Sequence, residues 1–458
     1  MKLQLDLSKE YGLVLEGGGA KGAYQIGAWK ALKEEGVKFK GLSGVSVGAL
    51  NGAMICMDDL DKAEEVWENI SYSQVMDINE EQIDLITRRD LKNINLNDVV
   101  QDALKLVRDR GVDITPLKNM IADLCDETVI RNSDMDFYIV TYSLSDRQLI
   151  DINAKDVPEG LIPDMLLASA YLPVFKREKL HGKHYMDGGG WDRVPVDSLI
   201  SRGYEDIIVL RIFGWGVEKP VKIPDYVRMI DIAPRQDLGG ILEFDSARSR
   251  KNMQLGYYDA KRVLYGLLGE EYYLDMELTE DEAYERLLPM ARQYIRQEEA
   301  RMQQEAAKKA EQEAQKKAEK DARKKGEREA SELLAENSTE DKKAEDKTAT
   351  EKTPAEKWIE ERLEARIEKT LEKLTERKTE LRQIHEDILP NLAKKLLKNR
   401  SWTYAELYIK LLEQTAQVLE IPCFSVYTEG QMLDLIGEKM KGCREQQMEL
   451  PEYAAFFL

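Results

Sequence analysis

The chain has 458 residues, a formal net charge of −19 and a pI near 4.9. Its length suits one large domain with one or two smaller units, and its acidic balance argues against a nucleic-acid-binding protein, which would present a basic face. Four scattered cysteines indicate neither a disulfide framework nor a metal site, and no long uncharged apolar run suggests a membrane-spanning helix. We expect a cytoplasmic protein without a cofactor, whose membrane contact is at most peripheral.

Residues 1–280 have the composition of a globular domain in which apolar runs of strand length alternate with amphipathic helical patterns. Helices separate the first runs, which favours parallel pairing and an α/β fold with helices on both faces of the sheet. We expect an antiparallel hairpin over 137–153, a mostly charged helical insertion over about 73–128 and a closing helix over 245–269. The predicted strands are 13–16, 38–44, 136–144, 206–214 and 227–234.

The composition changes after this domain. Residues 281–354 are rich in Ala, Glu, Lys and Gln, and predict a charged helix of coiled-coil type followed by a disordered linker. Apolar periodicity returns over 355–458, where we expect a helical bundle with a break at Pro390 and a helix cap at Ser401 or Thr403. This region is a candidate for self-association or for binding a helical partner. Its apolar stripe comprises Leu363, Ile367, Leu371, Leu374, Leu381, Ile384 and Ile388.

A glycine-rich loop follows the first predicted strand. Gly17, Gly19 and Gly22 fit the G-x-G-x-x-G pattern of a dinucleotide-binding turn. Such a site needs an acidic residue about twenty positions further on to bind the ribose hydroxyl, but no Asp or Glu lies between Gly36 and Asp58. A P-loop also fits poorly, because the lysine of this loop is followed by glycine rather than by Ser or Thr. The loop therefore favours an oxyanion as the target of its backbone N–H groups.

A candidate nucleophile occupies the end of the second predicted strand. Gly44, Ser46 and Gly48 form G-x-S-x-G between a short apolar strand and helix-forming residues, which is the context this motif requires. The turn forces the serine backbone into a strained conformation and needs small flanking residues. In return, the serine hydroxyl projects at the helix N-terminus, where developing negative charge is stabilised. Ser46 is therefore our candidate for acyl transfer.

The candidate base is a carboxylate rather than an imidazole. His385 lies in the charged C-terminal region, and His181 and His184 fit the tip of a hairpin, although a triad role for His184 stays an alternative. Asp187 follows a strand-like run and precedes three glycines. An acid at a strand end, followed by residues too small to block access, can reach a neighbouring loop.

With these three motifs in this order, the sequence resembles the patatin-like phospholipases, a family of serine acyl hydrolases that use a Ser–Asp dyad on an α/β sheet. The resemblance covers about residues 11–267 and implies a three-layer fold with a mainly parallel central sheet, to which the charged helical C-terminal region is added. It implies that Ser46 is the nucleophile and Asp187 the base. It assigns the oxyanion hole to Gly17, Gly18 and Gly19, with Lys21, Gly22, Gly44, Gly48, Gly188 and Gly189 as supporting residues.

One departure from the family pattern is visible. Members often carry Asn a few residues after the D-G-G motif, where this chain has Asp192 and Arg193. The dyad is unaffected, but the local hydrogen bonding and the orientation of the substrate are put in question.

The implied reaction is hydrolysis of a phospholipid, a lysophospholipid or another acyl ester through an acyl-enzyme. Acyl transfer to an acceptor other than water is an alternative within the same chemistry. A different class is an interaction or scaffold protein with a catalytically weak hydrolase domain and a partner-binding helical tail. Labelling of Ser46 by a fluorophosphonate distinguishes the enzyme from the scaffold.

Overall fold

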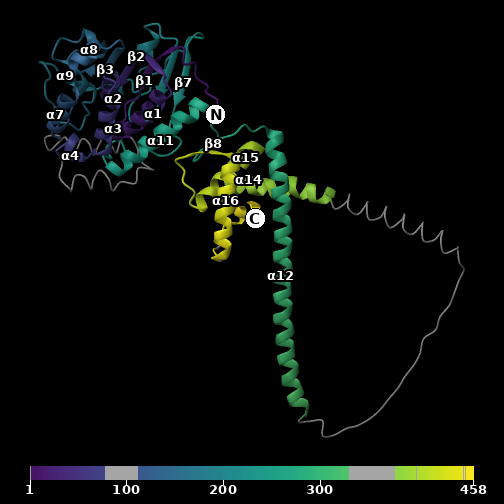
Figure 1. Ribbon diagram of the computed structural model, residues 1–458. Coiled ribbons are helices and arrows are strands. Elements are labelled where there is room, and N and C mark those ends of the chain that lie inside the picture. Colours follow the sequence, from purple (N-terminus) through teal and green to yellow (C-terminus); the bar gives the residue numbers. More distant parts are fainter. Residues whose placement is uncertain are drawn as a thin grey trace, which may run out of the picture. The chain divides into compact units, whose positions relative to one another are not determined.

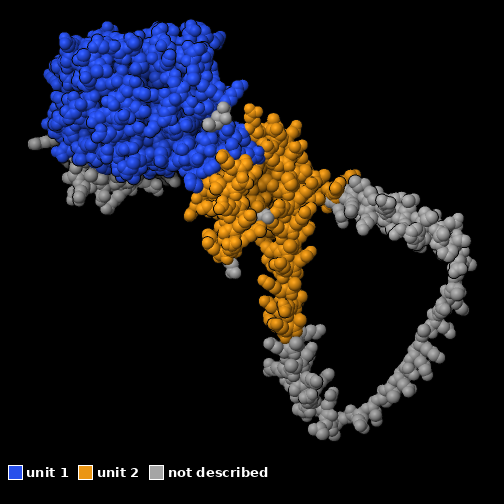
Figure 2. All heavy atoms as spheres, viewed as in Figure 1, with its two compact units in different colours: residues 1–276, 422–429 blue, residues 277–421, 430–458 orange. Residues whose placement is uncertain are grey.

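The structure, a computed structural model, describes residues 2–77, 112–329, 377–398, 400–446, 448 and 450–457, with the side chains of helix α12 described through residue 316. The chain forms two compact units (Figure 1, Figure 2). Unit 1 contains residues 1–276 and 422–429, and unit 2 contains residues 277–421 and 430–458.

Unit 1 is built on a seven-stranded sheet in the order β4-β3-β2-β1-β6-β7, with β5 paired to β3. Strands β1, β2, β3, β6 and β7 are parallel, whereas β4 and β5 pair antiparallel with β3. The sheet is therefore mainly parallel, and the predicted hairpin is confirmed. The strands are β1 Glu10–Leu15, β2 Lys38–Val45, β3 Asp136–Ser143, β4 Gln148–Asn153, β5 Tyr185–Asp187, β6 Asp206–Leu210 and β7 Arg228–Ile232.

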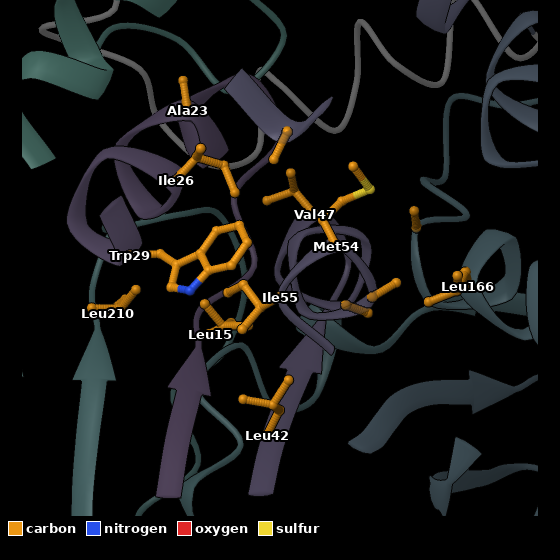
Figure 3. Packing of buried hydrophobic residues seen from close by; sticks show 14 of the residues in the cluster. Leu15, Ala23, Ile26, Trp29, Leu42, Val47, Met54, Ile55, Leu166 and Leu210 are labelled. Carbon is orange, nitrogen blue, oxygen red and sulfur yellow. The ribbon is translucent and has the colours of Figure 1, made fainter. Parts of the chain in front are cut away.

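Helices cover both faces of this sheet, as the alternation of side chains along β1 shows. Leu13 and Leu15 belong to the large core cluster shared with α1, α2 and α11, whereas Val14 belongs to a second cluster shared with α10. In Figure 3, Leu15 lies beneath Trp29 of α1 and Ile55 of α2. This is the expected three-layer α/β arrangement. The helices are α1 Ala23–Glu34, α2 Val47–Cys56, α3 Leu60–Glu68, α4 Tyr72–Val75, α7 Thr115–Leu124, α8 Glu127–Asn132, α9 Ile162–Ser169, α10 Val196–Ile200 and α11 Ser246–Tyr265, with short 3₁₀ turns η1 Gly19–Gly22, η3 Ala154–Asp156 and η4 Gly188–Gly190.

Two sequence expectations for unit 1 need comment. The predicted strand over 206–214 ends at Leu210, because the following residues leave the sheet and bind a buried carboxylate described below. Of the predicted insertion over 73–128, residues 78–111 lie outside the described residues, and the rest contributes α4, α7 and α8. The closing helix is confirmed as α11.

Unit 2 is helical in its described part, as expected for the tail. Its helices are α12 Glu280–Glu329, α14 Leu389–Leu397, α15 Tyr404–Val418 and α16 Glu429–Glu445, with a π turn at Ile384–Ile388 and a 3₁₀ helix at Glu452–Phe457. The first turns of α12 bury Ala283, Leu287, Ala291 and Ile295, one residue in four. Every described side chain from 301 to 316 is exposed, in agreement with the predicted charged helix. The first half of the stripe predicted further on, Leu363 to Leu374, lies outside the described residues.

The predicted helix break at Pro390 is wrong, whereas the cap at Thr403 is confirmed. The helix continues through Pro390, because the π turn just before it ends with Leu389 N–H donating to the Ile384 carbonyl five residues back. This wider turn places Pro390 in the first turn of α14, where its missing N–H costs no hydrogen bond. Thr403 caps α15 and forms a capping box with Glu406.

A small second sheet belongs to unit 1. β8, Tyr273–Asp275, pairs in parallel with β9, Val426–Thr428, so a segment from the C-terminal region completes the N-terminal unit. No helix in the described ranges is both long and apolar enough to cross a membrane.

Candidate active site

Ser46 occupies a strained elbow between β2 and α2. Its backbone has φ 57° and ψ −130°, in the positive-φ region that non-glycine residues rarely adopt. The glycines of the motif permit the close approach that the turn needs, because a Cβ atom on Gly44 would lie 2.4 Å from the Gly48 carbonyl oxygen, and one on Gly48 2.2 Å from the Leu15 carbonyl oxygen. The elbow predicted from G-x-S-x-G is therefore present.

A second serine holds this elbow and was not predicted. The Ser46 N–H donates to Ser169 Oγ at 2.8 Å, and Ser169 Oγ donates to the Val140 carbonyl oxygen at 2.6 Å. Ser169 ends α9 and is fully buried. Ser169 thereby connects the elbow to β3, and β3 also pairs with β5, the strand that ends at Asp187. The only sequence signal for Ser169 is its place in the run LLASAYLPVFKR, which resembles the family's helix and following loop.

Asp187 lies at the end of β5, where it is paired with Thr141 of β3, and only 4% of it is exposed. Its Oδ1 accepts a hydrogen bond from Gly189 N–H at 2.8 Å. Burial raises the pKa of Asp187 to about 6, against the opposing effects of the nearby Ser46 side chain and of the Gly189 N–H. The two predicted catalytic residues, far apart in sequence, therefore meet.

The hydrogen bonds of the glycine loop distinguish its occupied amides from its free ones. Ala20 N–H donates to Ile241 O at 2.8 Å, and Gly17 N–H donates to Arg193 O at 3.0 Å, so the Gly17 amide is occupied. No acceptor within the described parts of the chain is bound to the N–H groups of Gly18 and Gly19. Gly17 therefore shapes the loop, and the free donors are the next two glycines.

The remaining motif residues hold these segments together. Lys21 Nζ donates to the Phe213 carbonyl oxygen at 2.8 Å, and the Gly22 carbonyl oxygen accepts from Asn51 Nδ2 at 2.9 Å. The first of these bonds ties the glycine loop to the segment after β6, and the second ties it to the elbow helix. Gly188 permits close packing, because a Cβ atom there would lie 2.9 Å from the Val140 carbonyl oxygen.

The histidines are placed elsewhere. His181 pairs with Asp164, and His184 lies at the base of the predicted hairpin tip, where Leu180 and Lys183 pair. Neither is among the residues that line the cavity at Ser46. The described hydrogen bond of the Asp187 carboxylate comes from Gly189 N–H rather than from an imidazole.

Ser46 and Gly19 lie at the wall of an apolar cavity. Apart from Ser46 and Asn51, the lining side chains are hydrophobic, and they come mainly from α2, α3, α7 and α9. The Asn51 side chain is held by hydrogen bonds to other residues. Its Oδ1 accepts from Trp67 Nε1 at 3.0 Å, and its Nδ2 donates to the Gly22 carbonyl oxygen and to Gln25 Oε1. Prominent lining residues are Leu50, Met54, Met57, Val66, Ile70, Leu117, Met120, Ile121, Leu166 and Phe175.

Asp192 and Arg193, the departures from the family pattern, both have local partners. Asp192 is buried and its Oδ1 accepts from Val194 N–H at 3.3 Å, while burial raises its pKa to about 6. Arg193 pairs with Glu16 and with Glu218. Glu16, for which the sequence suggested no role, is fully buried beside the glycine loop.

The N-terminal part of the chain matches a family model. Residues 13–200 match the model of the family described as patatin-like phospholipase. A segment of 47 residues is 55% identical to neuropathy target esterase sws of Drosophila sechellia and 53% identical to that of Drosophila persimilis. The segment is 10% of this chain and 3% of either relative.

Two solved structures are also similar. VipD from Legionella pneumophila gives a TM-score of 0.34 at 16% identity, covering 56% of this chain and 67% of VipD. The type III effector ExoU gives a TM-score of 0.29 at 16% identity, covering 56% of this chain and 53% of ExoU.

Proposed function

Since residues 13–200 belong to the patatin-like phospholipase family, we propose that the chain is a lipid acyl hydrolase in which Ser46 is the nucleophile and Asp187 the general base. The observation that carries this proposal is the approach of a serine in a strained elbow to a buried carboxylate, at the wall of an apolar cavity. The substrate is an acyl ester of a lipid, since a cavity with almost no polar lining suits a hydrocarbon chain.

The reaction has two halves. Asp187 accepts the hydroxyl proton of Ser46 while Oγ attacks the ester carbonyl carbon, and the N–H groups of Gly18 and Gly19 stabilise the oxyanion. The leaving alkoxide takes that proton from Asp187 as the ester bond breaks, which leaves an acyl-Ser46 intermediate. Water then gives a proton to Asp187 and attacks the acyl group, and Ser46 regains its proton as the fatty acid leaves.

The raised pKa of Asp187 favours this role. A carboxylate with the ordinary pKa of about 3.9 is a weak base at neutral pH. Burial brings the pKa of Asp187 to about 6, closer to the value that suits proton transfer, while the group stays largely ionised at pH 7. No imidazole is needed in this scheme.

Labelling with a fluorophosphonate tests the proposal. We expect wild-type protein to be labelled on Ser46, and we expect Ser46→Ala to be unlabelled and unable to release fatty acid from phospholipid or lysophospholipid. Ser43→Ala is the matched control, because Ser43 is a fully buried serine three residues earlier in β2. It should be labelled like the wild type. Unlabelled wild-type protein would instead support the scaffold alternative, and product analysis with an added alcohol distinguishes acyl transfer from hydrolysis.

We also propose that a patch of exposed apolar side chains around the site, defined as Trp191, Phe213 and Val217, contacts the lipid surface. Their exposed fractions are 37%, 49% and 52%. The patch belongs to two loops joined to each other, since Val217 N–H donates to the Gly189 carbonyl oxygen at 3.0 Å. Exposed aromatic and aliphatic groups next to a lipid-cleaving site suit insertion into a membrane interface.

Vesicle sedimentation tests this contact. With zwitterionic phosphatidylcholine vesicles, which avoid repulsion by the net negative chain, we expect the double variant Phe213→Ser/Val217→Ser to bind at least about fivefold more weakly than the wild type, because about 0.8 kcal/mol is lost for each buried CH₂. Tyr226→Ser is the control. Tyr226 is 64% exposed and lies just before the start of β7. Since β6 and β7 are parallel, Tyr226 and Phe213, which follows the end of β6, lie at opposite ends of these strands. An equal loss in the control, or no loss in the double variant, would contradict the proposal.

A further inference from the structure

A carboxylate without an assigned role lies beside the proposed oxyanion loop. Glu16 directly follows β1 and precedes Gly17, and it is 0% exposed. Its Oε2 accepts hydrogen bonds from the backbone N–H groups of Ile212 at 2.8 Å and Phe213 at 3.1 Å, and its Oε1 accepts from Gly214 N–H at 3.2 Å. One side chain thus binds three consecutive amides of the segment that leaves β6.

Two guanidinium groups complete the environment of Glu16. Arg211 Nε donates to Oε2 at 3.1 Å, and Arg193 Nε lies 3.1 Å from Oε1. The same two arginines also bind Glu218 Oε2, each at 2.7 Å, so two cations and two carboxylates balance. A fully buried carboxylate is strongly destabilised unless it is paired and hydrogen-bonded in this way. These partners occupy both oxygens of the Glu16 carboxylate.

The groups held by Glu16 form the walls of the glycine loop. The Arg193 carbonyl oxygen accepts the Gly17 N–H at 3.0 Å. Gly214 packs directly on the loop, since a Cβ atom on Gly214 would lie 1.8 Å from the Gly17 carbonyl oxygen, and one on Gly18 would lie 2.7 Å from Ile212 Cδ1. The Glu16 contacts therefore fix two segments that surround the peptide groups of residues 17–19.

The opposite side of the loop is fixed independently. Gln25 Nε2 donates to the Glu16 carbonyl oxygen at 2.8 Å, and Asn51 Nδ2 donates to Gln25 Oε1 at 2.9 Å. Both side chains are buried. The backbone at Glu16 is thus held from α1 and α2, while its side chain holds the segment after β6. Displacing the segment after β6, against which Gly18 packs, would therefore change the direction of the amides of residues 17–19.

We propose that Glu16 is a positioning residue whose ion pairs with Arg193 and Arg211 and bonds to residues 212–214 aim the amides of Gly18 and Gly19 at the oxyanion. This inference rests on the proposed function, because it assigns those amides to the transition state. Removing the negative charge of Glu16 should therefore slow the chemical step and leave binding of the substrate in its ground state almost unchanged.

The test compares Glu16→Gln with Glu218→Gln in the full chain. Glu218 binds the same two arginines but is 45% exposed and has no described bond to the amides of 212–214. With a soluble short-chain ester, we expect Glu16→Gln to lower kcat about 100-fold, comparable to the loss of one oxyanion donor, with KM within about twofold. The rate of fluorophosphonate labelling of Ser46 should fall in parallel. Glu218→Gln should stay within about threefold of wild type in each quantity.

Because Glu16→Gln leaves two partly buried cations without one of their carboxylate partners, a second variant guards against simple unfolding. The double variant Glu16→Gln/Arg211→Gln removes one cation with the anion and leaves Arg193 paired to Glu218. We expect it to have a higher melting temperature than Glu16→Gln but the same low kcat. Wild-type kcat in either folded variant, or a raised KM with unchanged kcat, would overturn the positioning role. If wild-type Ser46 is itself unreactive, the proposed function fails instead.

Discussion

Asp187→Asn is expected to lower kcat by about 1,000-fold or more while the protein stays folded. The amide keeps the size of the carboxylate and an oxygen that can accept the Gly189 N–H, but it cannot take the proton of Ser46 Oγ. General bases contribute about 10²–10⁴ in rate, and in the proposed reaction Asp187 acts in both halves. Steady-state turnover of a soluble ester, together with thermal unfolding, checks both parts. Activity within about tenfold of wild type would show that another group serves as the base.

The role of Asp187 as a base also predicts how kcat/KM changes with pH. Because the pKa of Asp187 is raised to about 6, kcat/KM of the wild type should be constant above that pH and fall tenfold per unit below it. Asp192 also has a pKa raised to about 6, so the profile alone does not identify the group. We expect Asp192→Asn to keep the wild-type profile, because Asp192 accepts a bond from Val194 rather than from Ser46. A profile shifted by Asp192→Asn would contradict this assignment.

The contribution of Asp187 to the free energy of unfolding should fall as the pH rises, whereas kcat/KM should rise. A buried acid whose folded pKa exceeds its ordinary value binds its proton more tightly in the folded state. Its contribution is therefore fully present below about pH 4 and is lost as pH rises through about 6. At neutral pH, Asp187→Asn removes an unfavourable buried charge, and its free energy of unfolding should equal or exceed that of the wild type.

Gly48→Ala is expected to lower the free energy of unfolding by about 3 kcal/mol or more and to abolish labelling of Ser46. The added Cβ atom would lie 2.2 Å from the Leu15 carbonyl oxygen, a backbone atom at the end of β1 that cannot move aside easily, because β1 is paired on both sides. Chemical denaturation measures the loss. Gly190→Ala is the control from the same site, because its added Cβ atom would meet nothing within 4 Å. Similar midpoints for the two variants would mean that the elbow relaxes more readily than its contacts indicate.

The parts of the fold that the sequence made predictable are those governed by short-range pattern. Alternating apolar runs and helical periodicity gave the strands and the closing helix, and the G-x-S-x-G motif gave the elbow at Ser46. In each case the determining residues lie within one turn or one strand of each other.

The missed features depend on contacts between distant segments. In the sequence, Glu16 is only an acidic residue at the end of a predicted strand. Its partners, Arg193, Arg211 and the amides of 212–214, come close to it only in the folded chain. Ser169 likewise acquires its role only when α9 lies against the elbow. Occupation of the Gly17 amide follows from the path of the chain after Asp187. No local pattern encodes any of these partners.

The pairing of β8 with β9 affects how this protein can be divided. Shortening the gene after the codon for residue 276 would remove Val426–Thr428 and leave the backbone of Tyr273–Asp275 as an open edge. It would also uncover the Tyr258 ring, on which Phe424 stacks at 5.9 Å between ring centroids. Open strand edges with exposed aromatic rings invite aggregation. A shortened protein that keeps unit 1 intact therefore has to retain residues 422–429, for example grafted behind residue 276 through a flexible linker.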